Sequence, residues 1–176
     1  VRSKNKVLNI NWKLERKVVC EVPSGIRHLC SNPRVGIVGF NWKNRKIMFW
    51  DNDGNLSSVK WKKQPASLCL LSNGLLAVSL PGSLQAYNLS KNNMTDKVWN
   101  FKMDGVIKDK SIYQIQNTDK LAVWSSRSGA AVLNIDTGKL IARWKGIPGV
   151  QGVHSSFDGS RYLITNYMGS VYFCDA

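Results

Sequence analysis

The chain has 176 residues, enough for a domain with a hydrophobic core, and a hydrophobic fraction of 43% excludes a disordered polymer. The formal net charge of +14 suggests an acidic partner, most commonly nucleic acid; the alternative is a soluble domain that merely carries many lysines. Residues 1–63 hold 14 basic and four acidic residues, a net charge of +10, against +4 for residues 64–176. We therefore expect an acidic partner to bind the N-terminal half.

Short β-type runs that end in Asp or Asn recur along the chain. They cover residues 7–10, 47–50, 84–87, 132–135 and 171–174, followed by Asn11, Asp51, Asn88, Asp136 and Asp175. The polar ends are 40, 37, 48 and 39 residues apart. Apolar pairs at 37–38, 77–78, 122–123 and 163–164 lie 10 to 13 residues before these ends, with a turn signal between. The polar strand ends and the apolar pairs recur together along the chain, which indicates an internal repeat.

Two further strands complete each unit. Strand patterns precede the apolar pairs at residues 26–30, 67–71, 112–115 and 150–153, and others lie at 17–22, 56–60, 97–101 and 140–144. No long helical period interrupts them. The sequence therefore predicts an all-β protein built from units of about 40 residues, each with four antiparallel strands, the pattern of a β-propeller blade.

The last unit, residues 152–164 and 169–175, resembles a WD40 repeat, and residues 135–139 resemble the turn between the third and fourth strands of such a blade. Only Trp50-Asp51 spells the dipeptide that names the family, and no Gly-His dipeptide occurs. The resemblance implies one divergent WD40-like propeller segment over residues 1–176. It implies the end of a blade at 1–22 and blades at about 23–62, 63–101, 108–146 and 147–176.

About four blades are fewer than the seven or more with which WD40 propellers usually close. The resemblance therefore implies an incomplete ring or part of a larger propeller, with edges that further sequence or a partner chain would pair. A less favoured alternative is a self-closed ring of four blades in which residues 17–22 supply the last strand.

Candidate catalytic groups are sparse. His28 and His154 both fall inside predicted strands, so we interpret them as structural residues. We interpret Asp51, Asp136 and Asp175 as turn formers. Residues 51–55 superficially resemble a calcium loop but lack its glutamate, and no glycine-rich phosphate loop occurs. We expect no catalytic residue, no metal site, no cofactor and no small-molecule substrate.

Cys20, Cys30, Cys69 and Cys174 each sit in an apolar run without a C-x-x-C pair, which predicts buried, reduced thiols in a reducing compartment. Four tryptophans are predicted to pack in the core or between blades: Trp12, Trp99, Trp124 and Trp144.

The densest basic and aromatic segments are residues 42–46 and 60–63. They supply Trp42, Lys43, Arg45, Lys46, Lys60, Trp61, Lys62 and Lys63. In a blade, 42–46 is the turn between the second and third strands and 60–63 ends the fourth, so both can lie on one face. The cations could contact phosphates and a tryptophan could stack on an unpaired base. The alternative is a solvated loop with Trp61 packed between blades.

Two other segments are secondary basic candidates. One is the long connector at residues 90–110, and the other is an N-terminal basic arm at residues 2–6 that would order on an acidic partner. Together they carry Arg2, Lys4, Lys6, Lys91, Lys97, Lys102, Lys108 and Lys110.

We expect a non-enzymatic protein–protein scaffold within a large RNA-containing nuclear assembly, such as a ribosome-biogenesis complex. Its partners would be other protein subunits and RNA, with no membrane. The alternatives are a WD40 adaptor without nucleic acid (a substrate receptor, trafficking or chromatin scaffold) and, less favoured, a propeller hydrolase. The sequence shows neither a signal peptide nor an apolar run of membrane-spanning length, so we expect a nuclear or nucleolar setting, or else a cytoplasmic one, rather than secretion.

Overall fold

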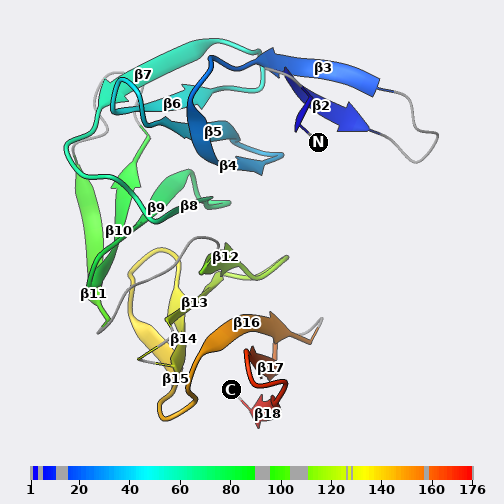
Figure 1. The fold of residues 1–176 in the computed structure, drawn as a ribbon, viewed down its shortest axis with the longest axis vertical. Helices are drawn as coiled ribbons and strands as arrows, with labels where there is room; N and C mark the ends of the chain where they lie inside the picture. The colour runs from blue at the N-terminus through cyan, green and yellow to red at the C-terminus, as the bar shows by residue number, and fades with distance from the viewer. Residues whose placement is uncertain are drawn as a thin grey trace. The chain divides into compact units, whose positions relative to one another are not determined.

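The computed structural model describes residues 2–3, 6–10, 16–89, 96–103, 111–125, 127, 129–156 and 159–175 (Figure 1). Over these residues the chain contains strands and turns and no helix. No described segment therefore forms a helix that is long and apolar enough to cross a membrane. The described chain divides into two compact units, residues 1–64 and 65–176.

The first unit contains two antiparallel sheets. A three-stranded sheet has the order β1 (Arg2–Ser3), β2 (Lys6–Ile10) and β3 (Arg16–Glu21). A four-stranded sheet follows with β4 (Ile26–Asn32), β5 (Gly36–Asn41), β6 (Lys46–Trp50) and β7 (Leu56–Lys60). The side chains of Cys20 and Val22 form one core cluster with Ile26, Met48 and Trp50.

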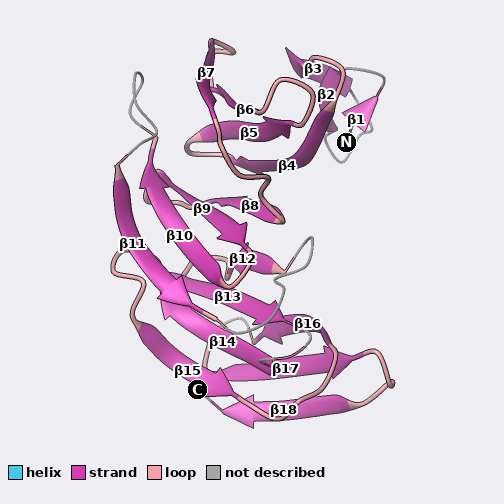
Figure 2. Cartoon of the chain, turned by 60° about the vertical axis from the view of Figure 1, so that its left-hand side comes forward, coloured by secondary structure: helices cyan, strands magenta, loops and turns pink. Residues whose placement is uncertain are grey.

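The second unit contains three antiparallel sheets that follow one another in chain order (Figure 2). The first is β8 (Ser67–Leu70), β9 (Leu75–Leu80), β10 (Ser83–Asn88) and β11 (Lys97–Lys102). The second is β12 (Ile112–Gln114), β13 (Lys120–Ser125), β14 (Gly129–Asn134) and β15 (Leu140–Trp144). The third is β16 (Val150–Ser155), β17 (Arg161–Asn166) and β18 (Val171–Asp175).

Each sheet is a meander in which consecutive strands pair, and short turns join described strands such as β6 and β7. Asp51 shows how such a turn is held: its carboxylate accepts the backbone N–H groups of Asp53 at 3.0 Å and Asn55 at 2.8 Å. The predicted turn role of Asp51 is confirmed. Asp136 also lies in a turn, between β14 and β15, but there Asn134 rather than Asp136 accepts the local N–H groups. The prediction is wrong for Asp175, which lies at the end of β18 rather than in a turn.

Two hydrophobic clusters hold the second unit together. One joins the β8–β11 and β12–β15 sheets through residues such as Leu84, Leu121 and Leu133. The other joins the β12–β15 and β16–β18 sheets through residues such as Trp124 and Ile164. Both faces of the middle sheet are therefore covered by apolar neighbours, which explains why β13 and β14 are buried along almost their whole length.

The predicted packing of the tryptophans is confirmed where it is described. Trp99 and Trp124 are buried, and the half-buried Trp144 packs against Tyr162 with ring centroids 4.9 Å apart. Trp12 lies outside the described residues. The cysteine prediction holds in part: all four are free thiols, but only Cys20 is fully buried. Cys30, Cys69 and Cys174 are half-buried.

Candidate functional site

The turn between β5 and β6 is fixed by Asn41, whose side chain is 3% exposed. Its amide nitrogen donates to the carbonyl of Ser24 at 3.3 Å, and its side-chain oxygen accepts the N–H of Lys43 at 3.1 Å. Between them, the N–H of Trp42 donates to the carbonyl of Gly25 at 3.1 Å. The backbone of Trp42 is thus tied down on both sides while 45% of the residue stays exposed.

The structure brings the two predicted basic segments together at the same end of one sheet. Strands β6 and β7 pair antiparallel with Lys46 opposite Lys60. One residue further along, the N–H of Trp61 donates to the carbonyl of Arg45 at 2.7 Å. Arg45 itself adopts a positive φ of 52°, which closes the turn. The sheet register therefore places residues 42–46 beside residues 60–63.

Among the described residues, the cations of this region have no acidic partner. Lys43, Arg45, Lys60, Lys62 and Lys63 are exposed, and Lys46 is half-buried. Over the described part of the chain, none of these six side chains forms an ion pair. Unpaired cations this close together raise the local positive potential and attract a polyanion.

Arg27 is a member of the site that the sequence analysis missed. It lies on β4, and its guanidinium carbon is 5.0 Å from the centroid of the Trp42 ring, a cation–π contact. Its place depends on a bulge between Arg27 and Cys30, where His28 takes a positive φ of 52°. No spacing in the sequence signals this bulge. We call the whole set the basic end, which comprises Arg27, Trp42, Lys43, Arg45, Lys46, Lys60, Trp61, Lys62 and Lys63.

The secondary basic candidates do not form one described surface. Lys97 and Lys102 are exposed at opposite ends of β11, a strand of the second unit rather than a loop. Arg2 and Lys6 are described through backbone pairing, which places the predicted basic arm in the strands β1 and β2. These residues of the arm, which was expected to order on an acidic partner, are thus already paired in strands within the chain. Lys4, Lys91, Lys108 and Lys110 lie outside the described residues.

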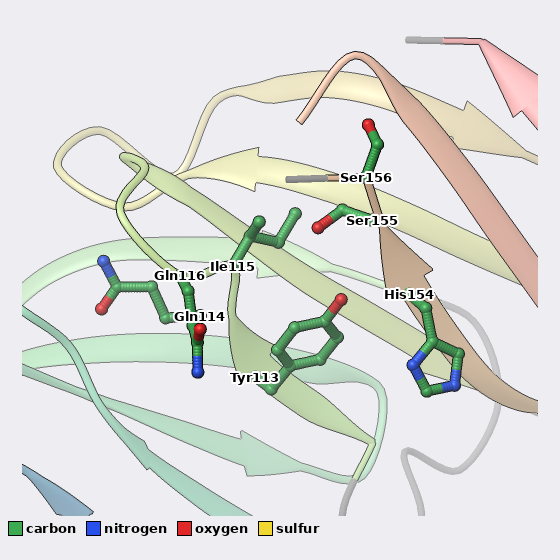
Figure 3. A pocket seen from close by; sticks show the side chains of 7 residues that line it. All are labelled: Tyr113, Gln114, Ile115, Gln116, His154, Ser155 and Ser156. Carbon is green, nitrogen blue, oxygen red and sulfur yellow. The ribbon is translucent and has the colours of Figure 1, made fainter. Parts of the chain in front are cut away.

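The second unit contains a pocket of about 470 Å³ beside β12 and β16 (Figure 3). It is lined by Tyr113, Gln114, Ile115, Gln116, His154, Ser155 and Ser156. Burial raises the pKa of Tyr113, while hydrogen bonding with Ser155 acts in the opposite direction. The Gln114 amide is already used, since its oxygen accepts the N–H of Ser72 at 2.7 Å and its nitrogen donates to the carbonyl of Thr118 at 2.9 Å.

The pocket offers neutral hydrogen-bonding groups and a single imidazole. No carboxylate belongs to its lining, so His154 has no acid there to orient it, and Tyr113 and Ser155 engage each other. Across the described ranges, no group of three or more His, Cys, Asp or Glu side chains could hold a metal ion. The chemistry of this pocket is suited to hydrogen bonding with a neutral group.

The comparisons with known proteins agree with the architecture. No family model matches the sequence, and no curated protein matches it significantly. The chain is similar to a subunit in a crystal structure of the mitotic checkpoint complex, with 16% identity and a TM-score of 0.66, over 87% of this chain and 49% of that chain. It is also similar to BBS1N in complex with ARL6DN, with 19% identity and a TM-score of 0.61, over 87% and 47%.

A third solved structure, streptogramin B lyase, matches 97% of this chain and 62% of its own, with 13% identity and a TM-score of 0.62. The chain thus spans about half to three fifths of the length of these three structures. Such neighbours are β-propeller proteins, and at these identities the likeness shows the fold alone. The predicted fold class is confirmed: this is an all-β chain whose antiparallel sheets are blades of a partial β-propeller.

Proposed function

We propose that the chain is a non-enzymatic scaffold of WD40 type that binds RNA through its basic end within a nuclear ribonucleoprotein assembly, such as a ribosome-biogenesis complex. The propeller fold supports an interaction scaffold in general, since two of its structural neighbours come from protein complexes. The RNA-binding role is supported by the residues of the basic end.

The main support for RNA binding is that seven cations lie in the basic end together with the exposed Trp42. None of the seven is paired with an acid among the described residues. Phosphates that contact these cations release condensed counterions, which makes binding favourable and strongly dependent on salt. Five such contacts predict a slope of about −3.5 for log K against log salt on single-stranded RNA. An uncharged partner would show no comparable slope.

A matched pair of triple charge reversals tests the assignment by fluorescence anisotropy with a labelled RNA. Lys43→Glu, Arg45→Glu and Lys46→Glu change the basic end, whereas Arg127→Glu, Lys139→Glu and Lys145→Glu change exposed cations of the second unit by the same charge. We expect the first triple to weaken binding by at least tenfold more than the second. Equal losses, or no binding by the unaltered protein, would refute the role of the basic end; circular dichroism checks that each variant folds.

The second candidate is a propeller adaptor that binds a protein and no nucleic acid, acting as a substrate receptor, a trafficking scaffold or a chromatin scaffold. The complexes in which two of the neighbours were solved favour it. This candidate predicts that a partner protein still co-purifies with the chain after nuclease treatment and in high salt. The RNA-binding proposal predicts that the partner is lost under both treatments. A propeller hydrolase is less well supported, since the pocket beside β12 and β16 lacks a carboxylate.

A further inference from the structure

We infer that the basic end selects unpaired over paired RNA, because Trp42, with Arg27 over its ring, forms a platform on which an unpaired base stacks. This inference rests on the proposed function and specifies the class of RNA that the same site takes. The argument depends on the contrast between what the cations recognise and what the indole ring recognises.

Trp42 is unusual among the described tryptophans of its sheet. Trp50, on β6, is 2% exposed and belongs to the core, whereas Trp42 is 45% exposed and lies among unpaired cations. The side-chain hydrogen bonds of Asn41 and the bond from the N–H of Trp42 to the carbonyl of Gly25 hold its main chain in place, so the exposed ring belongs to a fixed turn. A ring that is positioned before the ligand arrives loses little conformational entropy on binding.

Arg27 further restricts the ring. Its guanidinium carbon is 5.0 Å from the centroid of the Trp42 ring, and Trp42 is still 45% exposed. A planar guanidinium over an indole is already a stack, and a nucleobase extends or completes such a stack through its own π-face. Arg27 also brings a positive charge to the place where the sugar–phosphate chain of a stacked nucleotide would lie.

The lysines and Trp42 recognise different parts of RNA. Lys43, Lys60 and their neighbours contact phosphates, which both single strands and duplexes present. Base faces are available only where the bases are unpaired, since a duplex stacks them against one another. Trp42 therefore adds affinity for a single strand and none for a duplex, so that any discrimination between the two arises at this residue.

An acidic peptide is the competing ligand. It would satisfy the lysines, but it has no planar base to stack between a guanidinium and an indole. The Arg27–Trp42 pair thus favours RNA, and poly-glutamate serves as the probe that distinguishes the two classes.

The test measures the affinity of a single-stranded 12-mer RNA and of the matching 12-base-pair duplex for the unaltered chain, Trp42→Leu and Trp42→Phe. Trp42→Leu should weaken single-strand binding by between about 5-fold and 150-fold, the range that stacking of one base provides. Duplex binding should change by less than about twofold, and Trp42→Phe should retain most of the single-strand affinity, because it keeps an aromatic face. Adding the single strand should also quench tryptophan fluorescence more in the unaltered chain than in Trp42→Phe.

The outcomes separate the two proposals. If Trp42→Leu weakens both RNAs equally or neither, while the Lys43, Arg45 and Lys46 reversals weaken both, the stacking inference is overturned and the proposed function stands. If the unaltered chain binds neither RNA, both are refuted. If poly-glutamate displaces the single strand as effectively as an equal charge of unlabelled RNA, the specificity for RNA is refuted.

Discussion

Trp99 is the side chain whose removal should reveal how two successive sheets of the second unit are joined. It lies on β11, is 7% exposed and packs in the cluster between the β8–β11 and β12–β15 sheets. Its indole N–H donates to the carbonyl of Ile135 at 2.9 Å. The ring also lies directly over Gly138, where an added Cβ would come within 2.6 Å of it.

The size of the effect follows from these contacts. Trp99→Phe keeps most of the apolar contact but removes the indole N–H, so we expect a loss of about 1 kcal/mol from the free energy of unfolding. Trp99→Ala also leaves a large cavity, and we expect a loss of about 3–5 kcal/mol. Val98→Ala, on the same strand at a residue that is 48% exposed, should change stability by less than about 0.5 kcal/mol.

Urea unfolding followed by far-ultraviolet circular dichroism measures these differences without depending on tryptophan fluorescence. For a chain of this length the alanine variant should also unfold roughly 6–20 °C below the unaltered protein. If Trp99→Ala and Val98→Ala cost the same, or if Trp99→Phe is as damaging as Trp99→Ala, then Trp99 does not join the sheets as described.

Further predictions concern a glycine, a thiol and a charge. Gly129→Ala should strongly destabilise the fold, because the added Cβ would lie 2.0 Å from the carbonyl oxygen of Trp144. Gly82 has a similar positive φ but no atom within 4 Å of an added Cβ, so Gly82→Ala should lower the free energy of unfolding by only about 1 kcal/mol. Thermal unfolding of the two variants measures the difference. Burial raises the pKa of Cys69 to about 11, so at pH 9 an alkylating reagent should modify Cys69 far more slowly in the folded protein than in the unfolded chain. Because the thiol ionises more readily in the unfolded chain, the free energy of unfolding should fall as the pH rises from about 9 to 11. Lys60→Glu should replace a like-charged cross-strand pair by an attractive one, raising stability by about 0.2–1 kcal/mol in chemical denaturation while lowering affinity for RNA.

Local patterns carried most of the fold prediction. The apolar pair Ile37-Val38 and the acid at Asp51 mark a strand interior and a turn, and both functions act over a few residues, so the sequence displays them directly. At Asp136 the predicted turn position is correct, but Asn134, two residues earlier, also carries a short side chain and is the one that accepts the backbone N–H groups. Side-chain chemistry alone does not decide between neighbouring candidates of this kind.

The part of the candidate site that depends on neighbouring residues in the sequence was also predictable. Lys46 and Lys60 belong to adjacent strands joined by a short turn, so the hairpin sets their register. Arg27 was not predictable, because the bulge at His28 adds a residue on β4 and changes which side chains share a face. One bulge was therefore enough to hide the contact between Arg27 and Trp42 from an analysis of spacing.

The charges of the basic end are better explained by a ligand than by the stability of the fold. Lys46 and Lys60 are directly opposite each other on neighbouring strands, where like charges are destabilising. Nothing in the described chain neutralises them, and an exposed tryptophan lies in the same cluster, although burying it would have contributed apolar contact. Each feature is unfavourable in the isolated chain and becomes favourable when phosphates screen the cations and a base covers the ring. An arrangement that stabilises only the complex is what a binding surface requires, and the opposing effects expected for Lys60→Glu on stability and affinity follow from it.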